Sequence, residues 1–584
     1  MFQYKDYRAH LCQEIEKIFG TVENKGIIFS PPQEESFGDY TTNAAMVLAK
    51  VLRKSPQDIA QTLKKSLEEW PNVAKVEIGH PGYLNIFLCQ EYWQQSLRHL
   101  LSQRSRFGTL QPDENKRINV EYVSANPTGP LHVGHGRIAV VGDVLSNLLE
   151  AAGYHVTKEY YVNDAGAQVD HLTRSIYWHY CRHWECPEPY EFPDQGYRGA
   201  YVSEIAEALA ERHGQRYVNV EPAVWDPVFR ADGLHLIMKL IQEDLKSLSI
   251  HQDVMTFESK IQERLDSVME IFESKGLVYC GRPQEAPKSR KGSVDPKEQR
   301  PLTLLRSLDG DDVDRPLKKA DGSWTYFASD IAYHWDKVQR GFSQLINIWG
   351  ADHDQYVVRM KNALKALSPQ VSLHVVLCQM VQLSHKGEEL KMSKRAGTFV
   401  LLRDVVKSIG ADAFRFLMIT QSPHTHMDFC LEDILRQSKD NPIFYIQYAY
   451  ARACSVFRAA ESRFGEDSFS DDALSLADLS YLEPEDWQFM KKLWDWPRQV
   501  ERAAELYEPH RLCIFLHDVA KSFHGLWTQG RHCEGLRFVY EDHWERTRAK
   551  LALIQALRWV IRSGFKVFGV MPLEEMSPKD SENA

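Results

Sequence analysis

The stretch Glu121-Tyr-Val-Ser-Ala-Asn-Pro-Thr-Gly-Pro-Leu-His-Val-Gly-His135 decides the fold of this chain. An apolar-rich strand is expected at 118–123, and the prolines and glycine that follow break it. An amphipathic helix is predicted at 135–152, ended by Gly153, and a second strand at 155–162. The pattern therefore predicts a strand, a loop, a helix and a further strand in succession.

Such a unit places a helix N-terminus, with its unpaired N–H groups and positive dipole end, at the carboxyl edge of a parallel sheet, where nucleotides bind. His132 and His135 lie three positions apart across the loop-to-helix junction, so both imidazoles can face one phosphate chain. Gly134 and Gly136 allow a base or ribose to approach the backbone closely. The alternative is a glycine-containing turn with two surface histidines, because short His/Gly patterns also arise by chance.

A second stretch, Leu390-Lys391-Met392-Ser393-Lys394-Arg395-Ala-Gly397, forms a basic loop after a strand expected at 375–383. Alone, such a charge run is typical of a solvated loop. Following His-Val-Gly-His in this order, it resembles the second of the two signatures of class I aminoacyl-tRNA synthetases. The segment Ser124-Ala-Asn-Pro-Thr-Gly-Pro-Leu-His-Val-Gly-His-Gly-Arg137 is similar to the arginyl-tRNA synthetase version of the first signature.

The resemblance implies a doubly wound, Rossmann-type α/β parallel-sheet catalytic domain between an N-terminal α+β domain and a C-terminal all-α helical bundle. A chain of 584 residues is too long for one core, because single cores stop growing at about 250–300 residues. The expected divisions are an N-terminal domain at 1–111, a catalytic domain at 117–400 with an insertion at about 184–232, connecting helices at 401–435, and an anticodon-binding domain at 436–584.

Composition is ordinary for a soluble globular protein, with 43% hydrophobic and 26% charged residues. The first ten residues lack an apolar signal core, and no window is long enough to span a bilayer, so a cytoplasmic location is expected. A net charge of −10 argues against general coating of nucleic acid, but tRNA needs only a locally positive face. The basic runs at 282–300 and 546–566 are either phosphate tracks or solvated faces.

Ten cysteines without a disulfide rhythm fit reduced thiols. His179, Cys181, His183 and Cys186 could be read as a zinc site. They are crowded together without a second pair at finger-like spacing, so we expect no metal ligands there.

The first 111 residues mix helix and strand patterns, which predicts a small α+β domain. Helices are expected at 7–19, 41–52 and 56–69, and strands at 74–80 and 83–89. Asp39, Asn43 and the stretch Gly82-Tyr83-Leu84-Asn85 resemble the N-terminal domain of arginyl-tRNA synthetases, which contacts the tRNA corner at the D-loop. The alternative is that these residues cap helices and turns.

The second half of the catalytic sheet is expected to begin at 324–330 and to continue with a helix to 340, a strand at 345–349 and a turn at 350–356. Asp330 and Asp352 would then both follow strands, at the edge where doubly wound sheets bind ligands. Helix N-capping is the alternative role for each. A guanidinium is best held by a carboxylate in bidentate fashion, with an aromatic or hydroxyl partner.

The resemblance extends to single residues of an arginine site. Tyr326 and Asp330 match the tyrosine and aspartate that bind the substrate side chain in arginyl enzymes. Asn126 and Glu121 match residues that bind its α-amino and carboxylate end. Asp352 and Gln355 are further candidates, because the match across 350–356 leaves the pocket residue open.

The resemblance also implies the reaction: arginine's carboxylate attacks the α-phosphorus of ATP, and the 2′-hydroxyl of the terminal adenosine of tRNA(Arg) then takes the arginyl group. His132, His135 and the helix N-terminus would hold the phosphates, while Lys391 and Lys394 close from a loop. The ATP site would also include Gly134, Gly136, Met392 and Ser393. Mg²⁺ would be held by ATP oxygens and water rather than by a protein cage.

After the second signature the pattern is helical almost to the end. Helices are expected from 441, and at 485–506, 510–525 and 541–563. Tyr445, Tyr448 and Tyr450 could stack on anticodon bases, with core packing as the alternative for most of them. We expect a monomer whose partners are tRNA(Arg), L-arginine and ATP, without a membrane.

Three other classes remain open. A cysteinyl enzyme would use zinc to select its substrate thiol, and no cysteine stands beside the first signature. A tRNA-binding protein without catalysis would not need intact His132, His135, Lys391 and Lys394. A small-molecule nucleotidylyltransferase would not need the N-terminal unit or a whole C-terminal helical domain.

Overall fold

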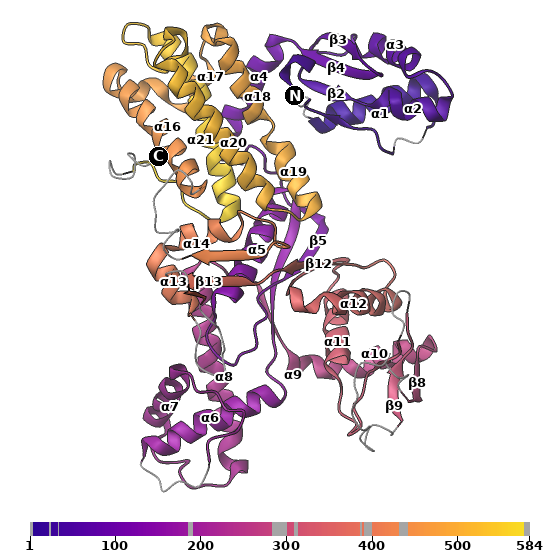
Figure 1. Cartoon of the computed structure of the whole chain (residues 1–584), viewed down its shortest axis with the longest axis vertical. Coiled ribbons are helices and arrows are strands. Elements are labelled where there is room, and N and C mark those ends of the chain that lie inside the picture. The colour runs from indigo at the N-terminus through magenta and orange to yellow at the C-terminus, as the bar shows by residue number, and fades with distance from the viewer. Residues whose placement is uncertain are drawn as a thin grey trace.

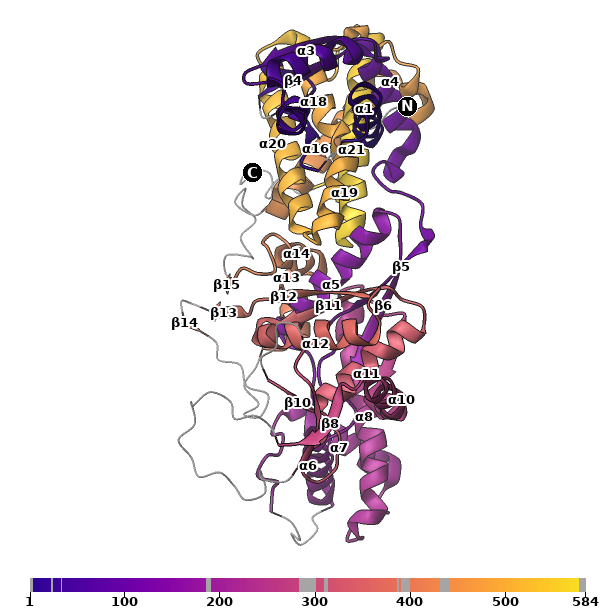
Figure 2. The same ribbon diagram turned by 90° about the vertical axis from the view of Figure 1, so that its right-hand side faces the viewer.

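The computed structural model describes residues 4–22, 25–32, 34–184, 191–282, 301–308, 313–385, 388–389, 400–430 and 442–576. The second signature, with Lys391, Met392, Ser393 and Lys394, lies outside these residues, as do Cys186 and most of the basic run at 282–300. Figures 1 and 2 show an elongated molecule with a helical bundle at one end of the long axis and a parallel sheet near the middle. Two lobes extend from the sheet at the other end.

A five-stranded sheet carries the first signature. Its strand order is β12-β11-β5-β6-β7, and all neighbours are parallel. The bounds are Ser372–Cys378 for β12, Gln344–Gly350 for β11, Asp113–Glu121 for β5, Tyr154–Val162 for β6 and Val254–Phe257 for β7. Because β6 lies on one side of β5 and β11 on the other, the strand order reverses at β5. Doubly wound sheets bind ligands outside the strand ends at such a reversal.

The first signature begins in the loop between β5 and helix α5, Val133–Ala151, and ends in the first turns of that helix. The expected β-loop-α-β unit is therefore present, but α5 is buried nearly all round rather than amphipathic. It contacts α13 (Leu402–Ile409), α14 (Ala411–Met418), α19 (Trp496–Leu506) and α21 (Trp544–Phe568) as well as the sheet. Packing is close: a Cβ at Gly142 would lie 2.2 Å from the Tyr122 ring.

The insertion predicted at 184–232 contains α-helices within its described residues. After α6 (Ala167–His183) come α7 (Ala200–His213) and α8 (Pro222–Ser247). From the sequence, a helix is expected only at 231–249, after the insertion, whereas α8 begins at Pro222. Pro222 lies in the first turn, where backbone N–H groups have no partner within the helix. A proline there costs no hydrogen bond, so the helix can begin earlier. These helices form the lobe at the lower left of Figure 1.

The other lobe contains the second half of the catalytic unit. It consists of α9 (Glu258–Ile261), α10 (Leu265–Ser274), β8 (Val278–Gly281), β9 (Leu302–Leu305), β10 (Arg315–Pro316), α11 (Tyr326–Gln339) and α12 (Asp354–Leu367). The strand expected at 324–330 is wrong, because Thr325 caps α11 by accepting the Ala328 N–H at 3.4 Å. Asp330 therefore lies one turn into a helix, and it neither follows a strand nor caps the helix.

The N-terminal unit has the expected α+β composition. Its antiparallel sheet has the order β1-β2-β4-β3. The elements are α1 (Tyr4–Phe19), β1 (Phe29–Ser30), β2 (Tyr40–Thr42), α2 (Ala44–Leu52), α3 (Pro56–Leu67), β3 (Val73–Gly79), β4 (Tyr83–Leu88) and α4 (Gln90–Gln103). The helix expected at 41–52 begins at Ala44, because Thr41 and Thr42 pair with β4.

Two N-terminal residues with a family resemblance have structural contacts here. Asp39 accepts the Leu88 N–H at 2.7 Å and pairs with Lys491 of the helical bundle at 2.5 Å. Asn43 accepts the Ile28 N–H and donates to the Gly26 carbonyl, which holds the preceding loop. Asn43 thus holds a loop, in line with the turn-capping alternative, whereas Asp39 joins the end of β4 to the helical bundle.

The bundle consists of α16 (Pro442–Phe464), α17 (Asp471–Ser475), α18 (Pro484–Trp494), α19, α20 (His510–Gly530) and α21. The single helix expected at 485–506 is two helices that meet at Asp495. The strand expected at 375–383 is likewise two, β12 and β13 (Val381–His385), and β13 pairs with β14 (Glu388–Glu389) and β15 (Met427–Cys430). Within the described residues, no helix has the length and hydropathy needed to span a membrane.

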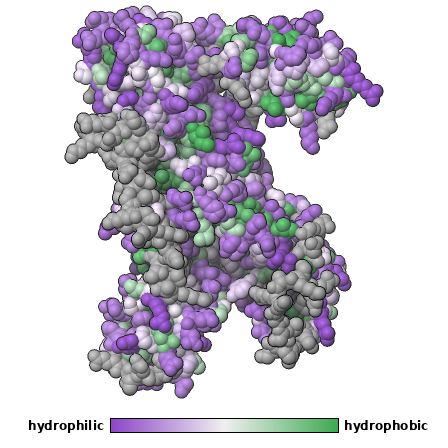
Figure 3. Space-filling view, in the orientation of Figure 1, coloured by the Kyte–Doolittle hydropathy of each residue, from purple (hydrophilic) through white to green (hydrophobic). Residues whose placement is uncertain are grey.

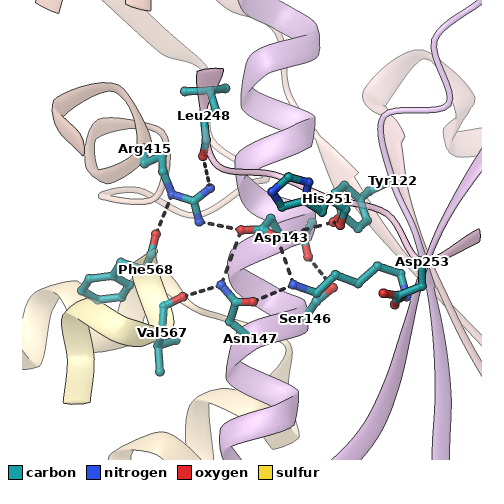
Figure 4. Close-up of polar contacts among 12 residues, drawn as sticks. Tyr122, Asp143, Ser146, Asn147, Leu248, His251, Asp253, Arg415, Val567 and Phe568 are labelled. Carbon is teal, nitrogen blue, oxygen red and sulfur yellow. Dashed lines mark hydrogen bonds and ion pairs between the residues drawn. The ribbon is translucent and has the colours of Figure 1, made fainter. Parts of the chain in front are cut away.

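Buried polar contacts join the bundle to α5 (Figure 4). Arg415 of α14 donates to the Phe568 and Leu248 carbonyls, each at 2.8 Å, and to the Asp143 carboxylate at 2.5 Å. Lys158 of β6 bonds Asp143 at 3.1 Å and Asn147 at 2.7 Å, and Asn147 donates to the Val567 carbonyl at 3.1 Å. We call Asp143, Asn147, Lys158 and Arg415 the Asp143 cluster. It attaches the C-terminal end of α21 to the signature helix.

Candidate active site

The chain makes a constrained turn directly after β5. Val123 and Ser124 have φ values of 69° and 37°, in the region that L-residues rarely occupy and that is unusual for a β-branched valine. The Ser124 hydroxyl donates to Glu121 at 3.0 Å and accepts the Tyr161 N–H at 3.1 Å. Strained backbone of this kind persists only where surrounding contacts hold it, and it concentrates at functional sites.

His132 and His135 come together at the start of α5. His132 is the N-cap residue, and its N–H donates to His135 Nδ1 at 3.3 Å. The two rings stack with centroids 3.7 Å apart and an angle of 23° between their planes. Both residues are partly buried, so they are not the freely exposed histidines of a surface turn. They lie together at the positive end of the helix dipole, where an anion is stabilised.

The two signature glycines have different surroundings. A Cβ at Gly134 would lie 3.1 Å from the His132 ring, so the missing side chain makes room for that imidazole. A Cβ at Gly136 would lie 2.6 Å from Leu402 and 2.7 Å from Phe414. Close packing of α5 against α13 and α14 therefore requires glycine at this second position, a reason that the sequence pattern did not reveal.

Three carboxylates gather beside this turn, and we call Glu121, Glu258 and Asp330 the acidic cluster. Glu121, at the end of β5, pairs with the fully buried Lys337 of α11 at 2.7 Å. Asp330 accepts the Tyr356 hydroxyl at 2.5 Å. Glu258 is buried directly after β7 and is hydrogen-bonded by Ser329. Asp330 and Glu258 are thus held by neutral hydroxyls.

The pKa of Asp330 is raised to about 7, chiefly by burial and also by the neighbouring charges of Glu121 and Glu258, while the Tyr356 hydrogen bond and Lys337 lower it. Burial also raises the pKa of Glu258. A raised carboxyl pKa means that the ionised form is disfavoured in its surroundings. A cation placed between these groups would stabilise that ionised form.

The other predicted arginine-binding residues are more exposed. Asn126 is exposed in the signature loop, and Tyr326 is 57% exposed at the start of α11. Asp352 has a side chain that is 79% exposed, and Gln355 is exposed as well. From this turn it is Tyr356 that reaches Asp330.

Sequence reasoning missed Tyr356 and Glu258 as members of the site. Glu258 had a usable signal, because it directly follows a strand at the carboxyl edge of the parallel sheet. Tyr356 had none of that kind, since the orientation of the first turn of α12 decides which residue faces Asp330.

The suggested zinc ligands are not assembled in the described part of the chain. There, no three His, Cys, Asp or Glu side chains are arranged to hold a metal ion. His179 instead packs edge-on against Trp178 and Phe192.

The three tyrosines of α16 differ in burial. Tyr450 is fully buried, in agreement with the core-packing alternative. Tyr448 lines a cavity of about 490 Å³ together with Arg452, Arg458, Trp527 and Arg531. Arg452 lies over the Tyr448 ring at 4.3 Å and the Trp527 ring at 4.9 Å. Tyr448 and Trp527 are partly exposed, and accessible rings beside cations are the arrangement that binds unpaired nucleobases.

Three protein families match successive parts of the chain. They are described as arginyl tRNA synthetase N terminal domain (residues 5–88), tRNA synthetases class I (R), catalytic domain (96–422), and DALR anticodon binding domain (446–576). The second match alone covers more than half of the chain.

Curated relatives are similar over nearly the full length. One named Arginine--tRNA ligase from Azorhizobium caulinodans is 43% identical over 98% of this chain and 99% of its own length. Another of that name from Ruegeria pomeroyi is 46% identical over 94% of both chains. The solved arginyl-tRNA synthetase of Thermus thermophilus shares the fold, with a TM-score of 0.71 over 98% of this chain and 100% of its own, at 21% identity. The chain belongs to the arginyl-tRNA synthetase family, within the class I aminoacyl-tRNA synthetases.

Proposed function

We propose that this chain ligates L-arginine to tRNA(Arg) with ATP, giving Arg-tRNA(Arg), AMP and pyrophosphate, and that the acidic cluster beside the signature turn selects arginine. The observation that carries the substrate assignment is Asp330, whose carboxylate is hydrogen-bonded by Tyr356, has a raised pKa, and forms no ion pair among the residues that the structure describes. Guanidinium remains protonated at all relevant pH values and matches a carboxylate in bidentate geometry.

The arginine side chain would enter between Asp330 and Glu258, with Tyr326 at the exposed mouth of the site. Tyr356 would keep Asp330 oriented through its hydroxyl. Glu121 and Asn126 would bind the α-amino and carboxylate end. Since Glu121 is already paired with Lys337, its position is set before substrate arrives.

The first reaction step needs no general base, because arginine's carboxylate is already a nucleophile. It requires alignment with the α-phosphorus and positive charge for the departing pyrophosphate. His132, His135 and the N–H groups at the start of α5 would hold the phosphates from one side. Lys391 and Lys394 would supply charge from the second signature, and Met392 and Ser393 would contribute to ATP binding. Mg²⁺ would be bound by phosphate oxygens and water.

In the second step the 2′-hydroxyl of the terminal adenosine of tRNA attacks the arginyl carbonyl carbon, and AMP leaves. The cavity beside Tyr448, Arg452 and Trp527 would hold an unpaired anticodon base by stacking. We further propose a cytoplasmic monomer with the domain divisions given above. Sedimentation would test its mass, and limited proteolysis would test the divisions.

The deciding experiment is arginine-dependent exchange of labelled pyrophosphate into ATP, with and without tRNA, and with cysteine and glutamine as controls. Exchange with arginine alone among these amino acids is the expected result. Dependence on tRNA would show that RNA completes the site. Exchange with cysteine or with no amino acid would overturn the proposed function.

A further inference from the structure

Asp244 is a buried carboxylate that none of the steps above uses. It lies near the end of α8, and only 2% of its surface is exposed. One carboxylate oxygen accepts the Leu131 N–H at 3.0 Å, and the other accepts the Arg403 Nε–H at 2.9 Å. Leu131 immediately precedes His132, and Arg403 lies in the first turn of α13.

The same two segments also meet through their backbones. Leu402 donates its N–H to the Leu131 carbonyl at 2.9 Å, and His132 forms an antiparallel bridge with Leu401. Both backbone groups of Leu131 are therefore bonded, one by Asp244 and one by Leu402. The backbone directly before His132 is therefore held by contacts from both α8 and α13.

We propose that Asp244 is a positioning residue for adenylate formation, which sets the location of His132 by fixing Leu131 and Arg403 together. The proposal rests on the proposed role of His132 and His135 in ATP binding. Asp244 would act only by holding the loop that precedes His132, because its contact with that loop is the hydrogen bond from the Leu131 backbone N–H. A displacement of about 1 Å in a reacting geometry can cost a hundredfold in rate, so loss of this clamp is expected to act on the ATP step.

The chain offers a closely matched control. Asp486 is also fully buried, accepts the Glu483 N–H at 2.8 Å and pairs with buried Lys550, but it lies within the helical bundle. Asp244→Ala and Asp486→Ala each remove a buried carboxylate that accepts a backbone N–H and pairs with a cation, one next to His132 and one in the helical bundle. Asp244→Asn keeps an acceptor for Leu131 but loses the charge that faces Arg403.

The test compares two steps in the full-length enzyme at saturating tRNA. Adenylate formation is measured as the release of pyrophosphate from ATP. Transfer is measured with chemically synthesised arginyl-adenylate as the substrate. For Asp244→Ala we expect a 10- to 100-fold slower adenylate formation and a raised KM for ATP. The KM for arginine and the rate of transfer should stay near those of the wild type. Asp244→Asn should show a smaller effect in the same direction.

Equal slowing of both steps at unchanged KM for ATP, as expected for Asp486→Ala, would overturn the proposal and leave Asp244 a purely structural residue. If Asp244→Ala does not fold, Asp244→Asn and Arg403→Met decide the question by the same two rates, and wild-type kinetics in both would overturn it. A wild-type enzyme without arginine-dependent exchange, or an unaffected His135→Ala variant, would instead contradict the proposed function.

Discussion

The Asp143 cluster and the acidic cluster both contain buried carboxylates, but they differ in the groups that surround the negative charge. Asp143 is met by two cations, Arg415 and Lys158 (Figure 4). In the acidic cluster, Asp330 and Glu258 are met by the neutral hydroxyls of Tyr356 and Ser329. A buried charge that is fully paired stabilises the contact between the elements that carry the pair. A buried carboxylate that is met only by neutral groups is destabilised in its ionised form, and a cationic ligand would relieve this.

The surroundings fit this division. The Asp143 cluster is enclosed between α5, α14 and the end of α21. In the acidic cluster, Glu121 ends β5 and Glu258 follows β7, while Asp330 lies in α11, which belongs to one of the two lobes that extend from the sheet in Figure 1. Figure 3 shows a largely hydrophilic face that is hollowed between these lobes. Asp330 of the acidic cluster is partly exposed, whereas Asp143 and Arg415 of the first cluster are buried.

The largest expected effect is on the paired cluster. Arg415→Met removes three hydrogen bonds and leaves Asp143 with Lys158 as its cation, so we expect a loss of about 3–5 kcal/mol in the free energy of unfolding. Urea unfolding followed by circular dichroism measures it. Arg415→Lys, which keeps the charge, should lose less. An unchanged unfolding midpoint for Arg415→Met would show that the pairing contributes nothing to stability.

One chemical change in both clusters sharpens the comparison. Asp330→Asn should raise the KM for arginine by about 10²-fold or more, because a charge-paired contact in a buried site contributes roughly 2–5 kcal/mol to binding. Its melting temperature should equal or exceed that of the wild type, since a disfavoured charge is removed. Asp143→Asn should show the reverse, with a lower melting temperature and a normal KM. Equal behaviour of the two variants would refute the distinction.

The pH dependence follows from the pKa of about 7 at Asp330. Below that pH the carboxyl holds a proton that a bound guanidinium must displace, so the KM for arginine should rise up to about tenfold per unit as pH falls. The stability of the arginine-free chain should depend on pH in the opposite direction. Between about pH 4 and 7 the folded chain keeps a proton on Asp330 that the unfolded chain has released, so the contribution of Asp330 to the free energy of unfolding declines as the pH rises through this range. Asp330→Asn should flatten both profiles.

The smallest effect is expected at the hydroxyl that holds the Asp330 carboxylate. Tyr356→Phe removes one hydrogen bond to Asp330 and should raise the KM for arginine about tenfold, as a bond to a charged group contributes about 1.5–3 kcal/mol. The turnover number should stay nearly constant. Steady-state kinetics with arginine varied would detect this, and an unaltered KM would remove Tyr356 from the site.

The signature turn could be predicted because its information is local. Proline and glycine positions end the strand, hydrophobic spacing starts the helix, and His132 and His135 therefore meet at one helix end. Asp330 was predicted in the site by resemblance, and the structure places it near Glu121 and Glu258, although its expected position after a strand was wrong. The choice among Asp352, Gln355 and Tyr356 was beyond local information, because one turn of α12 separates an exposed side chain from one that contacts Asp330.

The sequence by itself determined the order of elements, the turn that presents the two histidines, and the family. Only the tertiary structure decided which charges are paired. Glu121 meets Lys337 across 216 positions of the chain, and Asp143 meets Arg415 across 272. Hydrophobic period and turn chemistry act over a few residues, whereas ion pairs depend on which distant segments share a buried space. For this reason, only the tertiary structure distinguishes Asp330, which a neutral hydroxyl meets, from Asp143, which is paired with cations.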